Sequence, residues 1–195
     1  MGNNLKERLS IVETEIEAIK KELSFKKFQG LTVGDTFQLI GVNWRILDIT
    51  GKGYLCLAEI IDDSMRFGGE SNDWKSSGLR GYLNGKILHE IAEEIGADNV
   101  IPFERDLISL DGQTEYGKCT EKVSLISLDQ YRKYRKLIPN SEKYWWTLTP
   151  DSTKGNDDSR WVLVVSPPGY IGSHICVYDY GVRPFCIFSS ALFES

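Results

Sequence analysis

Cysteine and histidine are the most reactive residue types in this chain, but their spacing is unlike that of a metal site. A structural zinc site needs about four Cys or His ligands at short, recognisable spacings. The cysteines stand at Cys56, Cys119, Cys176 and Cys186, and the histidines at His89 and His174. No two cysteines form a C-x-x-C pair, and the N-terminus lacks an export signal. We therefore expect free thiols, no bound metal and no other cofactor.

The sequence patterns of nucleophilic catalysis are also missing. The chain has no G-x-S-x-G turn, and no cysteine has an evident histidine partner along the sequence. Nucleophiles of this kind need a base within hydrogen-bond reach, and the two histidines offer few such pairings. We therefore predict that the protein is not an enzyme, and we assign no catalytic residue.

An acidic loop is the remaining candidate for ion binding. Asp151, Asn156, Asp157 and Asp158 could offer oxygen ligands to a calcium ion. Their spacing differs from that of an EF-hand loop, and a calcium site needs about six or more converging oxygens. We therefore favour a solvated loop over a calcium site.

Two arginines lie in apolar segments and need partners wherever they are buried. Arg80 falls in a predicted helix, and Arg183 falls in the G-V-R-P segment beside an apolar strand. A buried guanidinium requires an anionic or carbonyl partner, which favours a structural role that ties sheet to helix. The candidate partners are Asp62, Asp63 and Asp73. We therefore assign Arg80 and Arg183 to the scaffold.

The segment YWWTLTP places two adjacent tryptophans on a predicted strand. Successive strand residues point to opposite faces, so Trp146 shares the apolar face with Tyr144, and Trp145 points to a mixed face. We expect Trp146 to lie in the main core. Trp145 either seals a second, smaller core under a helix or loop, or lines a recognition surface with Tyr178 and Tyr180. These three aromatic residues are the candidate ligand-binding residues.

A heptad pattern fills the N-terminal segment. Its apolar residues recur at alternating spacings of four and three, as in the seam of a coiled coil, and are Leu5, Leu9, Val12, Ile16, Ile19 and Leu23. In a parallel assembly, Arg8 would face Glu13 and Glu15 would face Lys20 of a partner chain, and both contacts are attractive. We therefore predict a parallel homo-oligomer, dimer or trimer, formed through residues 5–23. An amphipathic helix packed against its own globular part is the alternative.

Composition and charge exclude several classes of protein. The 195 residues are 41% hydrophobic and 26% charged, which is typical of a globular chain, and the net charge is −5. A general binder of phosphate backbones would carry clustered positive charge, so we expect no nucleic-acid partner. No run of about 18 uncharged apolar residues occurs, so we expect no membrane partner. The predicted location is the cytoplasm, or a virion if assembly carries the protein there.

The elements that position these residues follow from periodicity and turn residues. We predict an N-terminal helix over residues 1–29 and a separate α+β domain over residues 30–195. Turns at 41–43 and 50–53 divide the first strands into an antiparallel meander. On the second of these strands, Asp48 is expected to share a face with Trp44 and Ile46.

Three helices are indicated beside the predicted strands. One begins after Ser76 or Ser77 and ends at Asn84-Gly85, and the next ends at Gly96. A third begins at Ser127, where Gln130 completes the spacing of a capping box. We expect antiparallel sheets with two or three packed helices.

Five segments in order resemble one known pattern. They are NWRIL, DWKSSGLRGYLNG, LISLDQY, YWWTLTP and YGVRPF. Together they resemble a large uncharacterised family of bacterial and phage domains with W-x-V-L, L-R-x-W-L-N, W-W-L-R-S-P and G-V-R-P motifs. The resemblance covers roughly residues 35 to 190 and implies a C-type-lectin-like fold, as in formylglycine-generating-enzyme-like domains. Two positions depart from the pattern: Leu148 replaces an arginine, and Tyr82 replaces a tryptophan.

Taken together, these observations predict a non-enzymatic recognition module. It would be of phage or mobile-element origin and would bind a surface glycan or protein through a domain oligomerised by its N-terminal helix. The alternative is an intracellular inhibitor or regulator that binds a host protein, as a phage counter-defence protein would. An enzyme on a formylglycine-generating-enzyme-like scaffold is the third and least favoured reading.

Overall fold

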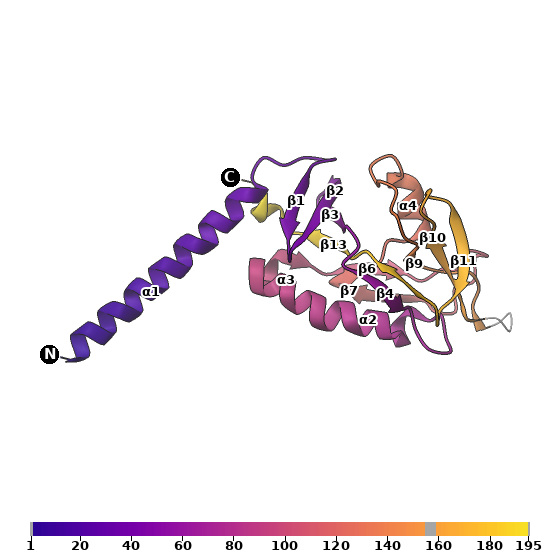
Figure 1. Ribbon diagram of the computed structural model, residues 1–195, viewed down its shortest axis with the longest axis horizontal. Helices are drawn as coiled ribbons and strands as arrows, with labels where there is room; N and C mark the ends of the chain where they lie inside the picture. The colour runs from indigo at the N-terminus through magenta and orange to yellow at the C-terminus, as the bar shows by residue number, and fades with distance from the viewer. Residues whose placement is uncertain (1, 155–158, 195) are drawn as a thin grey trace.

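The computed structural model describes residues 2–154 and 159–194, without the side chains of residues 2, 3, 17 and 20–24. Helix α1 (Gly2–Phe25) projects from a globular domain, and the N-terminus lies at its far end (Figure 1). At about 1.5 Å per residue, its 24 residues span roughly 36 Å. In the part of the chain that the structure describes, no helix has the length and apolar character needed to cross a bilayer.

The projecting helix joins the domain through an aromatic cluster. The 3-10 turn η1 (Lys26–Phe28) follows α1 and buries Phe28, whose ring lies 5.1 Å from Phe37 and 5.5 Å from Phe193, both edge-on. Phe193 follows the last 3-10 turn, η6 (Ser190–Leu192), so both ends of the domain meet at the base of the helix. Burial of these rings anchors the chain that follows the helix in the domain.

The first sheet is built from the predicted meander and later short strands. Its main strands run in the order β1-β2-β3-β13-β5, and β8 also pairs with β13. Their bounds are β1 (Thr36–Leu39), β2 (Val42–Thr50), β3 (Gly53–Ala58), β5 (Val100–Ile101), β8 (Val123–Ser124) and β13 (Phe185–Phe188). All described pairs in this sheet are antiparallel, which confirms the predicted meander.

The second sheet has the order β11-β10-β9-β12-β4. Its bounds are β4 (Asp62–Arg66), β9 (Trp145–Pro150), β10 (Trp161–Val165), β11 (Ile171–Ile175) and β12 (Asp179–Val182). Strand β12 pairs with β9 in the parallel direction, so the expectation of purely antiparallel sheets is wrong at this position. A separate hairpin joins β6 (Phe103–Asp106) to β7 (Lys118–Glu121).

The central helices form one continuous run rather than two separate helices. After the 3-10 turn η2 (Trp74–Ser76), Ser77 caps α2 (Gly78–Tyr82), as predicted. The expected end at Asn84-Gly85 is wrong, because a π-helical turn (Leu83–Ile87) leads directly into α3 (Leu88–Ile95). The Asn84 side chain instead exchanges two hydrogen bonds with the backbone of Val123 on β8, at 2.8 and 3.1 Å. A residue that resembles a terminator in sequence therefore ties the helix to the sheet.

Two hydrophobic cores lie on opposite faces of the sheets. The larger one contains Trp44, Phe67, Trp74 and Trp146 and packs beneath α2 and α3. The smaller one lies under helix α4 (Leu128–Tyr134), which begins with the predicted capping box of Ser127 and Gln130. The domain is therefore α+β, with helices packed against antiparallel and mixed sheets.

A β-bulge changes the face on which one charged residue lies. The pairing of β2 with β3 shifts between Ile46 and Asp48, which inserts Leu47 as an extra residue. Asp48 consequently lies on the side of α4, where it accepts hydrogen bonds from Tyr134 (2.6 Å) and Lys133 (2.9 Å). The expectation that Asp48 shares a face with Trp44 and Ile46 is therefore wrong.

Candidate recognition surface

Trp145 is buried and does not line a surface. Its side chain is 1% exposed and lies in the smaller core, with the Tyr131 ring of α4 edge-on at 5.7 Å. Assigning Trp145 to ligand binding is therefore wrong, and the alternative, a second core under a helix, is what the structure shows. Trp146 lies in the larger core at 0% exposure, as expected, and its indole nitrogen donates to the Met65 carbonyl at 2.8 Å.

Arg80 ties a helix to the β6–β7 hairpin. Its Nε donates to Glu121 at 2.6 Å, and one terminal nitrogen donates to the Lys75 carbonyl at 3.3 Å. The Glu121 carboxylate is almost fully buried, and its hydrogen bond raises the pKa of Arg80. The predicted structural role is supported by this contact, but the predicted partners are wrong. Asp73 caps η2, Asp62 accepts from Ser64, and Asp63 pairs with Lys143.

Arg183 stacks on Trp145 and bonds to a carbonyl. Its side chain is 3% exposed, its Nε donates to the Ala58 carbonyl at 2.8 Å, and its guanidinium lies 4.9 Å from the Trp145 ring centre. Burial lowers the pKa of Arg183 to about 10. Cation–π stacking and the carbonyl bond hold the residue in place of the expected Asp or Glu.

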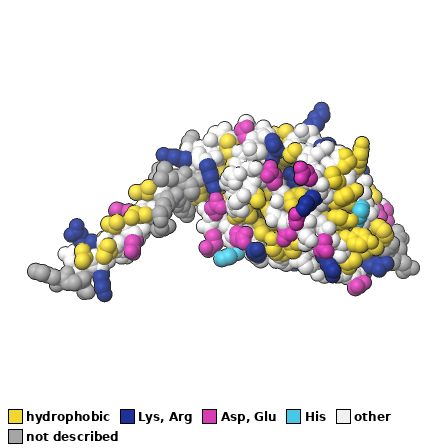
Figure 2. Space-filling model, in the orientation of Figure 1, with side chains coloured by type: hydrophobic (Ala, Val, Ile, Leu, Met, Phe, Trp, Pro, Cys, Tyr) yellow, Lys and Arg dark blue, Asp and Glu magenta, His cyan; other side chains and the backbone are white. Residues whose placement is uncertain are grey.

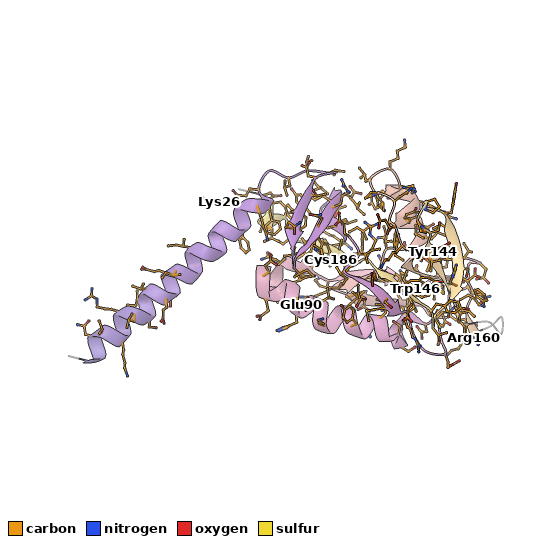
Figure 3. All side chains as sticks on the ribbon, in the orientation of Figure 1. Lys26, Glu90, Tyr144, Trp146, Arg160 and Cys186 are labelled. Carbon is orange, nitrogen blue, oxygen red and sulfur yellow. The ribbon has the colours of Figure 1, made fainter. Side chains whose placement is uncertain are left out.

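Four residues form an exposed aromatic patch on the second sheet: Tyr144, His174, Tyr178 and Tyr180. Tyr178 is 50% exposed and Tyr144 is 38% exposed, and their rings lie on either side of Tyr180 at 6.3 and 5.6 Å. Hydrophobic side chains gather at this end of the domain in Figure 2, and Figure 3 places Tyr144 close to Trp146. The patch is therefore a continuous aromatic surface far from the projecting helix.

The strand register positions the patch. His174 on β11 is paired with Val162 on β10, and Val164 on β10 is paired with Trp146 on β9, so His174 lies on the same face as Trp146. Tyr180 on β12 joins this face, with its ring 5.0 Å from that of Trp146. The buried indole supports the exposed rings from below, which fixes their orientation.

A partly buried hydrogen bond links two members of the patch. The Tyr180 hydroxyl lies 2.5 Å from Nδ1 of His174. Burial lowers the pKa of His174 and raises the pKa of Tyr180, so both groups are neutral near neutral pH. The neutral imidazole is suited to accept the phenol hydrogen, which makes the pair a rigid, uncharged centre. An ion pair of Arg66 with Asp179, at 4.0 Å, lies next to Tyr180 in the β4–β12 ladder.

Sequence reasoning found half of this patch. The sequence predicts Tyr178 and Tyr180 as binding residues, but it places Tyr144 on the core face and gives His174 no role in binding. His174 lies on β11 and Tyr180 on β12, with Tyr178 in the turn between them, so strand alternation along the sequence does not connect the histidine to the tyrosines. Tyr144 lies just before β9 begins, so strand periodicity does not describe its direction.

No family model, curated protein or solved structure matches this chain. The resemblance to the bacterial and phage domain family therefore stays a prediction.

The metal-ligating residue types are dispersed in the described part of the chain. Within residues 2–154 and 159–194, no three His, Cys, Asp or Glu side chains are grouped as metal ligands. All four cysteines are free thiols. Burial raises the pKa of Cys119 to about 12, which disfavours the nucleophilic thiolate. Asn156, Asp157 and Asp158 of the predicted solvated loop lie outside the described residues.

Proposed function

We propose that this protein is a non-enzymatic recognition module that presents the aromatic patch at the end of a helical stalk. The observation that carries the proposal is the exposure of Tyr144 and Tyr178 beside half-buried Tyr180, whose ring packs on the buried indole of Trp146. Rigid tyrosines supply contact area at low cost in conformational entropy, and they are enriched where proteins recognise ligands.

The chemistry of the patch favours a glycan ligand. Tyrosine rings pack against the C–H faces of sugar rings, and tyrosine hydroxyls exchange hydrogen bonds with sugar hydroxyls. The patch itself carries no formal charge while His174 is neutral, which suits an uncharged polyol. A surface glycan is therefore the ligand that we favour over a protein.

The stalk supports a second part of the proposal, a parallel homo-oligomer. The described seam residues are exposed: Leu5 (64%), Leu9 (53%), Val12 (49%), Ile16 (45%) and Ile19 (56%). At these residues the helix does not pack against its own domain, and this exposure supports assembly over the alternative of intramolecular packing. The side chain of the sixth seam residue, Leu23, lies outside the described residues. Isolated helices of this length are marginal in water, and a partner helix would cover the seam.

Charge placement favours the parallel direction. An antiparallel pair that matches the same seam would place Glu13 against Glu13, and Glu15 against Glu15, of the partner chain. Like charges at these flanking positions destabilise the assembly, whereas the parallel pairing of Arg8 with Glu13 is attractive. A parallel arrangement would also direct the domains to the same side. Several weak patches could then bind one surface at once, which raises avidity without a strong single site.

The proposal also includes the fold family of the domain and the biological origin of the protein. A C-type-lectin-like fold is supported by the resemblance of the five sequence segments and by the pairing of the early strand β3 with the last strand β13. The same resemblance supports a phage or mobile-element origin and association with a virion. Under this proposal the patch would face a bacterial surface.

Glycan binding is the direct test. The wild type, Tyr178→Ala and Tyr170→Ala would be compared on an array of bacterial surface oligosaccharides. Tyr170 is the matched control because it is 74% exposed but lies outside the patch. We expect Tyr178→Ala to weaken binding at least tenfold, about 1.4 kcal/mol, and Tyr170→Ala to leave it unchanged. Equal binding by all three proteins would refute the role of the patch. A different result would favour the alternative of an intracellular inhibitor or regulator. In that case the wild type would bind no glycan but one host protein in a fixed stoichiometry, and Tyr178→Ala would lose that partner.

A further inference from the structure

A cleft of about 850 Å³ is lined in part by Lys143, the residue that precedes Tyr144 of the aromatic patch. One wall is formed by residues 59–63, which span the connection after β3 and the first two residues of β4, and the other lies in the connection between α4 and β9, residues 139–143. Arg183 also lines the cleft. The volume falls in the range of about 300–1,000 Å³ that is typical of small-ligand sites.

The guanidinium of Arg183 lacks a complete set of partners. Its Nε donates to the Ala58 carbonyl, and its face lies over the Trp145 ring. Its two terminal nitrogens donate no hydrogen bond to any described residue, and they are not among the side-chain atoms sealed from solvent. Arg183 is only 3% exposed and lines the cleft, so its free N–H donors point into the cleft.

Arg183 is also held in place before any ligand binds. The carbonyl bond and the stacked indole restrict its rotation, so little conformational entropy is lost when the free donors are used. Two terminal donors in one plane match the two oxygens of a carboxylate. The base of the cleft is thus suited to a planar anion.

The rim of the cleft carries the opposite charge. Four acidic residues line it, namely Glu59, Asp62, Asp63 and Glu142, against the single rim cation Lys143, which pairs with Asp63. An acidic rim repels phosphate and other multiply charged anions. It favours a ligand that brings hydroxyl or ammonium donors along with its anionic group.

We propose that the Arg183 cleft binds a small ligand carrying one carboxylate together with hydroxyl or ammonium groups. The carboxylate lies on the Arg183 guanidinium, and the donors of the ligand lie on the acidic rim. Two sources share this chemistry: a sugar acid, which brings hydroxyls, and an amino-acid zwitterion, which brings an ammonium. The site is distinct from the aromatic patch and stands whether or not the patch binds a glycan.

Binding of four small probes tests the proposal on the full-length protein. D-Glucuronate and L-alanine represent the two sources, D-glucose lacks the carboxylate, and inorganic phosphate lacks the accompanying donors. Each would be titrated by NMR, with the side-chain N–H signal of Arg183 as the readout. We expect glucuronate, alanine or both to shift that signal, with glucose and phosphate at least tenfold weaker. Whichever of glucuronate and alanine binds more tightly identifies the class of ligand, a sugar acid or an amino acid.

Two variants check the rim without disturbing the buried arginine. Glu142→Ala removes an exposed acceptor from the cleft, and Glu93→Ala removes an exposed carboxylate from α3 as the control. We expect Glu142→Ala to weaken the affinity for the carboxylate probe at least threefold and Glu93→Ala to leave that affinity unchanged. The proposal is overturned if no carboxylate shifts the Arg183 signal, if glucose or phosphate binds as tightly, or if both variants behave like the wild type.

Discussion

The guanidinium of Arg183 lies 4.9 Å above the ring of Trp145. The two residues belong to YWWTLTP and GVRPF, segments far apart in the chain that parallel pairing of Gly181 with Trp145 brings side by side. Trp145 therefore lies in the smaller core, and the Arg183 side chain stacked on it lines the cleft. This contact explains why Trp145 is not available at the surface.

Removal of Trp145 should be costly to stability. Trp145→Ala would empty a fully buried site and unstack Arg183, and large-to-small changes of this kind cost about 3–5 kcal/mol. Urea denaturation would measure the loss. Tyr178→Ala, at a half-exposed position, should change the free energy of unfolding by no more than about 0.5 kcal/mol. Equal losses for the two variants would contradict the assignment of Trp145 to the core.

The Arg80–Glu121 contact should behave as a coupled pair. Glu121→Ala leaves the guanidinium with only the Lys75 carbonyl, and Arg80→Ala leaves a buried carboxylate. Because Arg80 is about a third exposed, solvent screens the pair, and we expect each change to cost about 1.5–3 kcal/mol. A double-mutant cycle measures the coupling. Strictly additive losses would show that the two side chains do not interact.

Charges in the stalk seam should abolish self-association. Leu9→Glu with Ile16→Glu places carboxylates in the seam, where a partner helix would bury them. Light scattering at increasing concentration should report a monomer for this variant and a constant oligomer for the wild type. Ile11→Glu is the matched control, because Ile11 is 54% exposed but lies outside the seam. A wild-type protein that stays monomeric at high concentration would contradict the predicted assembly.

Acidification should weaken the domain through His174. Burial places its folded-state pKa below the usual 6.5, so the neutral ring is favoured in the fold. The unfolded chain then binds the proton more readily, and stability is highest above pH 6.5 and falls as the pH drops through the folded-state pKa. Urea denaturation from pH 8 to pH 4 would measure this slope. His174→Gln should flatten this slope, and a variant whose stability falls as steeply as that of the wild type would contradict the role of His174.

Gly53 should tolerate no side chain. Its φ is +128°, and a Cβ there would lie 2.2 Å from the Phe188 carbonyl oxygen across the β3–β13 pair. We expect Gly53→Ala to lower the free energy of unfolding by more than about 1 kcal/mol. Gly51, two residues earlier in the same turn, would meet nothing within 4 Å among the described residues. The Gly51→Ala variant should therefore have a melting temperature within a few degrees of that of the wild type. A comparable loss of stability in both variants would refute the proposed clash at Gly53.

Local features of the sequence determined where the helices begin and where the first strands turn. The hydroxyl of Ser77, the capping box of Ser127 with Gln130, and the glycines of the meander act within a few residues, so their effect is independent of the fold. The heptad spacing likewise predicted a continuous helix, because helical propensity and periodicity are properties of neighbouring residues.

Only the tertiary structure decided which distant groups meet. The bulge at Leu47 turned Asp48 toward α4, and the parallel pairing of β12 with β9 brought Arg183 onto Trp145. Arg80 met Glu121 rather than a nearby aspartate, because partner choice depends on register across strands and not on sequence distance. The aromatic patch arose in the same way, since its rings come from three chain segments that pleating and strand order place on one face.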